Sequence, residues 1–427
     1  MPQSLPLAAN YIAALLFAIA VLHTFSTGIF TRLAHHQPAH AGLWHLLGEV
    51  EAVFGFWAFI LVIALVLLVG SPGAVDYLQS QNYTEPMFVF VIMVIAASRP
   101  ILEAIQGLIR NAARLLPVNT NLAAFMLTLS VVPLAGSFIT EPAAMTLAAL
   151  ILREAFFKQG LKQNLQYATV GALFVNVSIG GTLTPFAAPP VLMVAGKWGW
   201  DISHMLLHFG WKSALAVIIN ALVVTLLFRK EISAKGDLPT DTELQRIPHT
   251  VTIINVLFLC GVVIFAHHPV VFMGLFLFFL GFTEAYPHHQ GRLILRESLM
   301  VGFFLAGLVT LGSLQQWWLK PALSGIDSTV LYFVATALTA ITDNAALTYL
   351  GSLVEGTDAA FKYALVAGAV TGGGLTVIAN APNPAGFAIL KHYFPDGTIS
   401  PLKLFLAASL PTVVAIFAFL GLRGIPA

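Results

Sequence analysis

The sequence predicts an all-α polytopic membrane protein. Of its 427 residues, 58% are hydrophobic and only 9% are charged, whereas about 25% of the residues in a soluble globular protein are charged. The mean hydropathy is +0.87. So few charged side chains cannot cover the surface of a water-soluble protein of this length. We therefore expect much of the surface to face lipid.

Ten apolar stretches are long enough to cross a bilayer, which takes about 20 residues. In chain order they are Ala8–Phe30, Leu43–Gly70, Pro86–Leu108, Tyr167–Gly196, His208–Phe228, Thr250–Ala266, Val270–Tyr286, Ser298–Trp318, Tyr363–Leu390 and Leu402–Leu422. Two more apolar stretches, 119–157 and 327–353, are interrupted in the middle by charged and helix-breaking residues. We interpret these two as re-entrant hairpins, which enter and leave the membrane on one side.

The basic side chains support this arrangement if the N-terminus lies outside. The fourteen that then fall in the cytoplasm are Arg32, Arg110, Arg114, Arg153, Lys158, Lys162, Arg229, Lys230, Lys235, Arg246, Arg292, Arg296, Lys391 and Lys403. The five that fall outside are Lys197, Lys212, Lys320, Lys362 and Arg423. Cytoplasmic loops of membrane proteins carry the excess of Lys and Arg. We expect a multi-pass protein with both termini outside.

A polar segment, residues 229–249, divides the chain into two halves. We interpret it as a cytoplasmic linker between a first repeat, 1–228, and a second repeat, 250–427. Each repeat would hold five crossings and one hairpin. Because five is odd, the second repeat enters the membrane from the opposite side. The prediction is an inverted repeat.

Two pairs of short sequences match between the halves. Ile139–Thr146 and Ile341–Thr348 are identical at five of eight positions, and Glu141 pairs with Asp343. Each lies at the interruption of a predicted hairpin. Downstream, a Gly-Gly-Thr-Leu-Thr-Pro run and a Gly-Gly-Gly-Leu-Thr run interrupt the stretches 167–196 and 363–390. Non-helical backbone is tolerated in a membrane only where it faces protein or water, and paired broken helices indicate a transporter binding site.

The two acids at the predicted hairpin tips are the strongest candidates for a functional site. An acid at the bilayer centre costs about 2.5–3.5 kcal/mol on insertion scales, so two at equivalent positions call for an explanation. The simpler explanation is that each carboxylate only caps the helix that follows it. Hard cations prefer oxygen ligands, and we predict that Glu141 and Asp343 bind Na⁺ directly. Further candidate ligands are Thr140, Thr342, Asn344, Thr184, Thr376, Asn380 and Asn383, with Asn176 a weaker one.

Competition between a cation and a proton at these carboxylates would produce antiport. Burial disfavours the charged form of a carboxylate, so a buried acid binds either a proton or a cation. Binding of Na⁺ then expels the proton, and protonation expels Na⁺.

Three of the sequence runs in these regions resemble those of a known family. The runs Ile139–Thr146, Ser178–Pro190 and Ile341–Thr348 are similar to those of the bacterial putative Na⁺/H⁺ antiporter family, within the ion transporter superfamily that includes arsenite pumps and Na⁺-coupled dicarboxylate carriers. The resemblance covers most of the chain. It implies a bacterial inner-membrane protein of two inverted repeats, often a homodimer, that moves its transport domain as an elevator. It also implies Na⁺ or Li⁺ and H⁺ as the transported ions.

The sequence gives less support to other classes of function. The sequence contains no phosphate-binding Gly-x-x-x-x-Gly-Lys-Ser/Thr run, no catalytic triad and no long basic run for nucleic acid, and Cys260 is its one cysteine. We therefore expect neither an enzyme nor a bound cofactor. The alternative is a Na⁺- or H⁺-coupled carrier of a small anion or metabolite, of the dicarboxylate or arsenite type. A channel or an intramembrane enzyme is a third possibility, which the paired broken helices disfavour.

Overall fold

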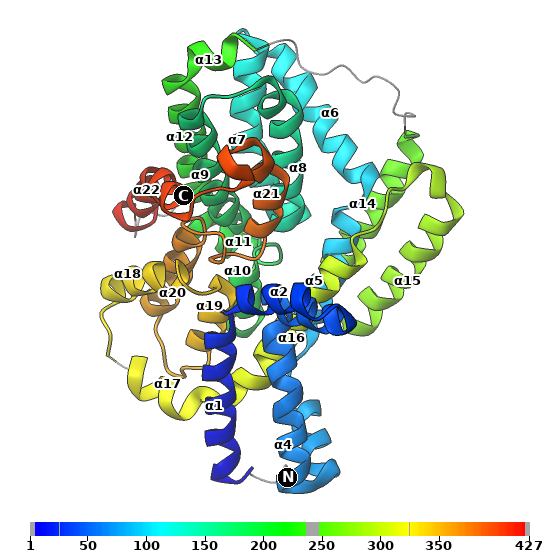
Figure 1. The fold of residues 1–427 in the computed structure, drawn as a ribbon, viewed down its shortest axis with the longest axis vertical. Helices are drawn as coiled ribbons and strands as arrows, with labels where there is room; N and C mark the ends of the chain where they lie inside the picture. The colour runs from blue at the N-terminus through cyan, green and yellow to red at the C-terminus, as the bar shows by residue number, and fades with distance from the viewer. Residues whose placement is uncertain (1–4, 25, 236–246, 324, 423–427) are drawn as a thin grey trace. The chain divides into compact units, whose positions relative to one another are not determined.

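The computed structural model describes residues 5–24, 26–235, 247–323 and 325–422, and every regular element in these ranges is helical (Figure 1). Six of these helical segments are long and apolar enough to cross a membrane. They are Leu7–Thr24, Ala52–Gln79, Thr120–Ile139, Ile202–Leu227, Leu295–Leu323 and Pro401–Gly421. The predicted fold class, an all-α polytopic membrane protein, is confirmed.

The chain forms two compact units. The first unit consists of Met1–Phe90, Leu295–Ile326 and Tyr349–Asp358, and the second of Val91–Ile294, Asp327–Thr348 and Ala359–Ala427. Each unit therefore takes segments from both halves of the sequence. The predicted repeats, 1–228 and 250–427, are continuous segments of the chain and do not coincide with these units. The repeats stay a prediction.

The first unit is built around α4. Its helices are α1 (Leu7–Thr24), α2 (Thr27–His36), α3 (Ala41–Leu47), α4 (Val50–Gln79), the first part of α5 (Thr84–Ala96), α16 (Leu295–Gly312), α17 (Gln316–Leu323) and the end of α19 (Asn344–Ser352). α4 packs against α1 and α16. α4 has a kink at Gly70, where φ is 77°, two residues before Pro72, and helical backbone continues past this point to Gln79.

The second unit contains the first predicted hairpin, both predicted broken helices and the second predicted hairpin as far as Thr348. Its helices before residue 247 are α6 (Arg99–Leu115), α7 (Thr120–Ile139), α8 (Glu141–Ala155), α9 (Gln163–Gly180), α10 (Pro189–Trp198), α11 (Ile202–Met205), α12 (Trp211–Leu227) and α13 (Arg229–Ser233). Those after it are α14 (His249–Ile264), α15 (Pro269–Ala285), α18 (Ser328–Thr339), α20 (Ala359–Gly372), α21 (Asn383–Leu390) and α22 (Pro401–Ile416), with the first part of α19. α7 packs against α8, α9 and α12, and α18 packs against α20 (Figure 1).

The interruptions occur where the sequence predicts them. Hairpin 119–157 is α7 and α8 with a break at Thr140, and hairpin 327–353 is α18 and α19 with a break at residues 340–343. The stretch 167–196 breaks between α9 and α10, and the stretch 363–390 breaks between α20 and α21. α7 has 20 residues and is by itself long enough to span. The re-entrant course of the hairpins therefore stays a prediction.

One predicted span is not a continuous helix. The stretch Pro86–Leu108 is divided between α5 and α6, whose axes differ by 61°. Pro100 is the second residue of α6, and a proline has no N–H to bond the carbonyl four residues earlier, so it is tolerated at the start of a helix but disfavours one continuous helix through this point. The helix that follows carries Arg99, Glu103, Arg110 and Arg114.

The predicted linker 229–249 is described only at its two ends. It begins with the short helix α13 and ends at the start of α14. Residues 236–246, which include Asp237, Asp241, Glu243 and Arg246, lie outside the described residues.

Candidate functional site

The break between α7 and α8 places Glu141 at the first position of a helix. Thr140, the residue before it, has φ 73° and is the one non-glycine residue with positive φ in the part of the chain that the structure describes. Such a backbone costs about 1–3 kcal/mol and persists only where the surrounding structure holds it, often at functional sites. α7 and α8 approach each other closely next to this residue, since a Cβ on Gly136 would lie 3.1 Å from Cβ of Ala144.

Ser137 ties this hairpin to the first broken helix. Its hydroxyl donates to the carbonyl of Gly180 over 2.7 Å and accepts the backbone N–H of Leu183 over 2.9 Å. The hydroxyl of Thr184 donates to the carbonyl of Ser137. The carbonyl and N–H groups freed where α9 ends are thus bonded to the hairpin. These hydrogen bonds to the hairpin fix the backbone of the first break.

The carboxylate of Glu141 contacts both broken helices. The side chain is completely buried. Its Oε2 accepts a hydrogen bond of 2.7 Å from Nδ2 of Asn380, in the break between α20 and α21. Its Oε1 lies against the first break, because a Cβ added to Gly181 would be 2.5 Å from it. That Oε1 has no hydrogen-bond partner.

The second acid is bonded differently. Oδ1 of Asp343 accepts the backbone N–H groups of Ala345 over 2.8 Å and Ala346 over 3.1 Å, so this carboxylate caps α19. It also interacts electrostatically with Glu141. The next residue, Asn344, donates its backbone N–H to the carbonyl of Ala379 over 3.2 Å. Residues 379 and 380 therefore join the two tips, one bonded to each.

Six buried side-chain oxygens at the tips and the second break have no hydrogen-bond partner. They are Thr140 Oγ1, Glu141 Oε1, Thr339 Oγ1, Asn344 Oδ1, Asn380 Oδ1 and Asn383 Oδ1. Leaving one buried polar group unpaired costs about 1–3 kcal/mol, and native structures contain few such groups. These six oxygens belong to the two tips and to the second break, whose Asn380 is bonded to Glu141. Oxygen is the ligand that hard cations prefer.

The hydroxyls of three predicted ligands are used within the protein. Thr184 donates to Ser137, Thr376 donates to the carbonyl of Ala340 over 2.8 Å, and Thr342 donates to the carbonyl of Leu338 over 2.8 Å. These bonds use the hydroxyl hydrogen and hold the backbone of the breaks and of the second tip. A lone pair of each oxygen is still able to contact a cation.

Sequence reasoning missed Thr339 and Gly181. The tip alignment pairs Thr339 with Ser137, so extending the repeat by two residues would have identified it. Gly181 gives the Glu141 carboxylate its space, which a Cβ would fill. That close approach is a tertiary contact and has no signal in the sequence apart from the glycine itself.

Asn176 is bonded between helices and does not share the unpaired oxygens. Its Nδ2 donates to the carbonyls of Leu129 in α7, over 2.7 Å, and Val217 in α12, over 3.3 Å. Its Oδ1 accepts from Nδ2 of Asn220 over 2.9 Å. Every polar atom of the Asn176 side chain therefore joins one helix to another.

We expect Asn176→Ala to lower stability and to leave cation affinity unchanged. Removing hydrogen bonds of a buried amide costs about 1–3 kcal/mol, so the unfolding temperature in detergent should fall. The concentration of Na⁺ that half-saturates transport should stay at the wild-type value. The comparison variant is Asn380→Ala, which removes the bond to Glu141 and should raise that concentration. A raised value for Asn176→Ala would return this residue to the set of ligands.

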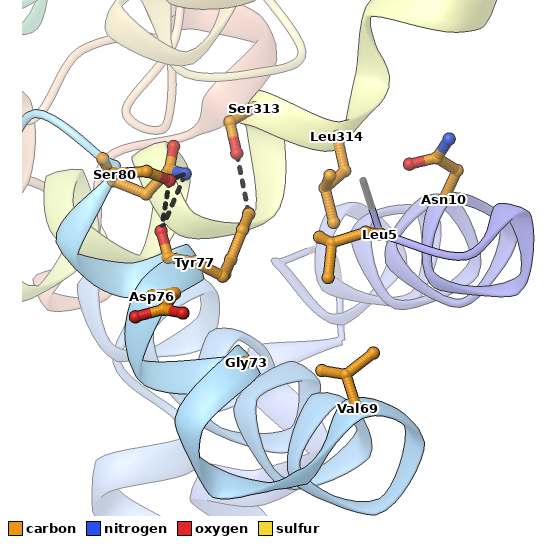
Figure 2. A pocket seen from close by; sticks show the side chains of 10 residues that line it. Leu5, Asn10, Val69, Gly73, Asp76, Tyr77, Ser80, Ser313 and Leu314 are labelled. Atoms are coloured by element: carbon orange, nitrogen blue, oxygen red, sulfur yellow. Dashed lines mark hydrogen bonds between the residues drawn. The ribbon is translucent and has the colours of Figure 1, made fainter. Parts of the chain in front are cut away.

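The first unit contains a cavity (Figure 2). It has a volume of about 380 Å³ and is lined by Leu5, Asn10, Val69, Gly73, Asp76, Tyr77, Ser80, Gln81, Ser313 and Leu314. The hydroxyl of Tyr77 lies 2.7 Å from Oγ of Ser313, and Ser80 and Gln81 donate to the carbonyl of Tyr77. None of these ten lining residues has a buried side-chain atom without a partner. The cavity lacks the feature that marks the hairpin tips.

Comparison with known proteins identifies the family. The sequence model of the putative Na⁺/H⁺ antiporter family matches residues 8–422. The match covers nearly the whole chain, and the protein belongs to this family. A search of curated proteins found no match. Membership, together with the apolar helices, makes the protein a multi-pass membrane transporter of the cation/proton antiport class.

Proposed function

We propose that this member of the putative Na⁺/H⁺ antiporter family exchanges Na⁺ or Li⁺ for H⁺ at the hairpin tips. The observation that carries the proposal is the set of six unpaired buried oxygens at the two tips and the second break, one of which is Oε1 of Glu141. In the ion-bound form, oxygens of this set and the carboxylates of Glu141 and Asp343 surround the cation. In the proton-bound form, a proton replaces the cation and supplies the same positive charge.

The chemistry of the site favours a cation over an anion. Its charged groups are two carboxylates, and the unpaired atoms comprise six oxygens and a single donor, Nδ2 of Asn344. An anion would leave those oxygens unpaired and would face two acids. Transport of a small anion is therefore the second candidate function.

The grouping of the site supports an elevator-type alternating access. Glu141, Asp343, Asn344, Asn380 and Asn383 all belong to the second unit. A site whose ligands lie in one compact unit can keep its geometry while that unit moves. We propose that the second unit carries the ion and that the first unit serves as its scaffold. We also propose that the protein is a homodimer in the bacterial inner membrane, with both termini on the outside.

Proton flux in proteoliposomes tests the function. The purified protein is reconstituted, a pH gradient is imposed, and a pH-sensitive dye reports its decay after addition of Na⁺, Li⁺ or K⁺. We expect Na⁺ or Li⁺ to dissipate the gradient, because cation binding expels the proton from the shared carboxylate. Protein-free liposomes give the leak. Absence of a response to all three cations would reject the exchange, and Na⁺-driven uptake of small anions would be measured next.

A further inference from the structure

We propose that the first unit binds a phospholipid whose head group carries a phosphate and a primary amine. The site is a groove formed by two adjoining cavities, which we call the head-group groove. All of its residues belong to the first unit, and none is a proposed ion ligand. The proposal goes beyond ion exchange, so measurements of lipid binding decide it whatever the transport assays show.

The two cavities of the head-group groove share part of their lining. The first has a volume of about 380 Å³ and the second of about 450 Å³. The residues that line both are Asn10, Ser313 and Leu314. The second cavity is also lined by Gln316, Trp317, Lys320, Leu353 and Glu355. Pockets for small ligands have volumes of about 300–1,000 Å³, so the groove has room for a lipid head group.

The groove lies at the ends of three helices that belong to candidate membrane spans. Asn10 is near the start of α1, Asp76 is near the end of α4, and Ser313 directly follows α16. Next to the groove, the rings of Tyr11 and Trp317 meet edge to face with their centroids 5.3 Å apart. Tyrosine and tryptophan gather at the level of the lipid head groups. The groove is therefore at the depth where head groups lie.

Asp76 offers a partner for an amine. It is exposed, and it is the one charged residue in the lining of the first cavity. Among the described residues it has no basic ion-pair partner. Asn10 lies on the opposite side of this cavity (Figure 2). A primary ammonium has three donors and a positive charge, so it can bond the carboxylate of Asp76 and a neighbouring neutral oxygen.

Lys320 offers a partner for a phosphate. It lines the second cavity beside Gln316 and Trp317, and hydrogen bonds between an ammonium and a phosphate are charge-assisted. Glu355 lines the same cavity, so the two acids of the groove outnumber its one base. A head group with a phosphate alone would bring only negative charge to this lining. The charges therefore favour a head group that also carries an amine.

An exposed apolar stripe on α1 favours a lipid over the free head group. Leu7, Tyr11 and Leu15 are spaced four residues apart, so they lie on one face of the helix. Each is more than half exposed, with exposed fractions of 62%, 55% and 61%. The stripe runs along α1 past Asn10, which lines both cavities. Acyl chains of a lipid seated in the groove would cover this stripe, whereas soluble phosphoethanolamine would leave it bare.

The unfolding temperature of the delipidated protein in detergent tests the head group. It is measured against added phosphatidylethanolamine or phosphatidylglycerol with the same acyl chains, because both have the phosphate and only the first has the amine. We expect phosphatidylethanolamine to half-saturate the stabilisation at a concentration about fivefold lower, which corresponds to about 1 kcal/mol. Equal half-saturating concentrations, or no stabilisation by either lipid, would overturn the proposal.

Free phosphoethanolamine tests the source of the head group. Without acyl chains it should need a far higher concentration than the lipid to give the same stabilisation, because it leaves the stripe on α1 uncovered. Saturation at the concentration that suffices for the lipid would show that the groove takes a soluble zwitterion and would reject the lipid.

Two variants separate the amine from the phosphate. Asp76→Asn keeps the shape of the side chain and removes its charge. It should raise the half-saturating concentration of phosphatidylethanolamine about fivefold and leave that of phosphatidylglycerol unchanged. Lys320→Gln should raise both concentrations about fivefold, since both lipids carry the phosphate. Unchanged lipid affinities in both variants would exclude the groove as the site.

The matched control is Glu297→Gln. Glu297 is an exposed acid in the first turn of α16, within the first unit but outside the lining of the groove. This variant should bind both lipids with wild-type affinity. A fivefold change in Glu297→Gln, equal to that in Asp76→Asn, would mean that the net charge of the protein sets the affinity, and the proposed site would be wrong.

Discussion

Replacing Glu141 with glutamine is expected to abolish Na⁺-dependent proton movement. Glutamine has the same shape and still accepts the hydrogen bond from Asn380, but it can neither bind nor release a proton in this pH range. The cation also loses its fully buried carboxylate partner. A buried charge left without its partner costs about 3–5 kcal/mol, or more than about a hundredfold in affinity. The assay is the dye-reported proton flux on addition of Na⁺.

The matched control is Glu154→Gln on the same helix. Glu154 is partly exposed and pairs with Arg153 and Lys158. Exposed ion pairs contribute about 0–1 kcal/mol, so transport should stay within about twofold of the wild type. The unfolding temperature of Glu141→Gln should not fall, since the substitution removes a buried charge. A folded Glu141→Gln protein that retains coupled flux would exclude Glu141 as the proton carrier.

Substitution of Gly374 by alanine is expected to disrupt the fold around the site. A Cβ at this position would lie 2.3 Å from Cα and 2.4 Å from N of Val175. Both are backbone atoms of α9, so no side-chain rotation can relieve the clash. Overpacking a core costs about 1–3 kcal/mol and occasionally more, and we expect the upper end of this range. The same contact joins the two broken helices near their centres, so ion exchange should fall with stability.

Gel filtration and the unfolding temperature in detergent measure this effect. The control is Gly274→Ala in α15, where an added Cβ would meet no atom within 4 Å. That variant should match the wild type or be slightly more stable, because alanine has the higher helix propensity. Equal behaviour of the two alanine variants would mean that α9 and the segment after α20 do not cross as closely as described.

Much of the fold could be predicted because it depends on local properties of the chain. Hydropathy identifies the apolar helices, and clusters of glycine, proline and charge identify the breaks at 140, 181–188, 340–343 and 373–382. Hydropathy does not fix where a helix begins, ends or bends. The span Pro86–Leu108 bends at Ser98, although its hydropathy alone predicted one helix.

The sequence by itself determined the membrane class, the places where helices break and the presence of Glu141 and Asp343 at equivalent tips. Tertiary structure decided that one acid caps its helix while the other is buried with a free oxygen. It also decided that Asn176 joins helices while Asn380 meets Glu141 from 239 residues away. The physical reason is that helix formation depends on near neighbours, whereas the partner of a buried polar group depends on which distant segments pack together.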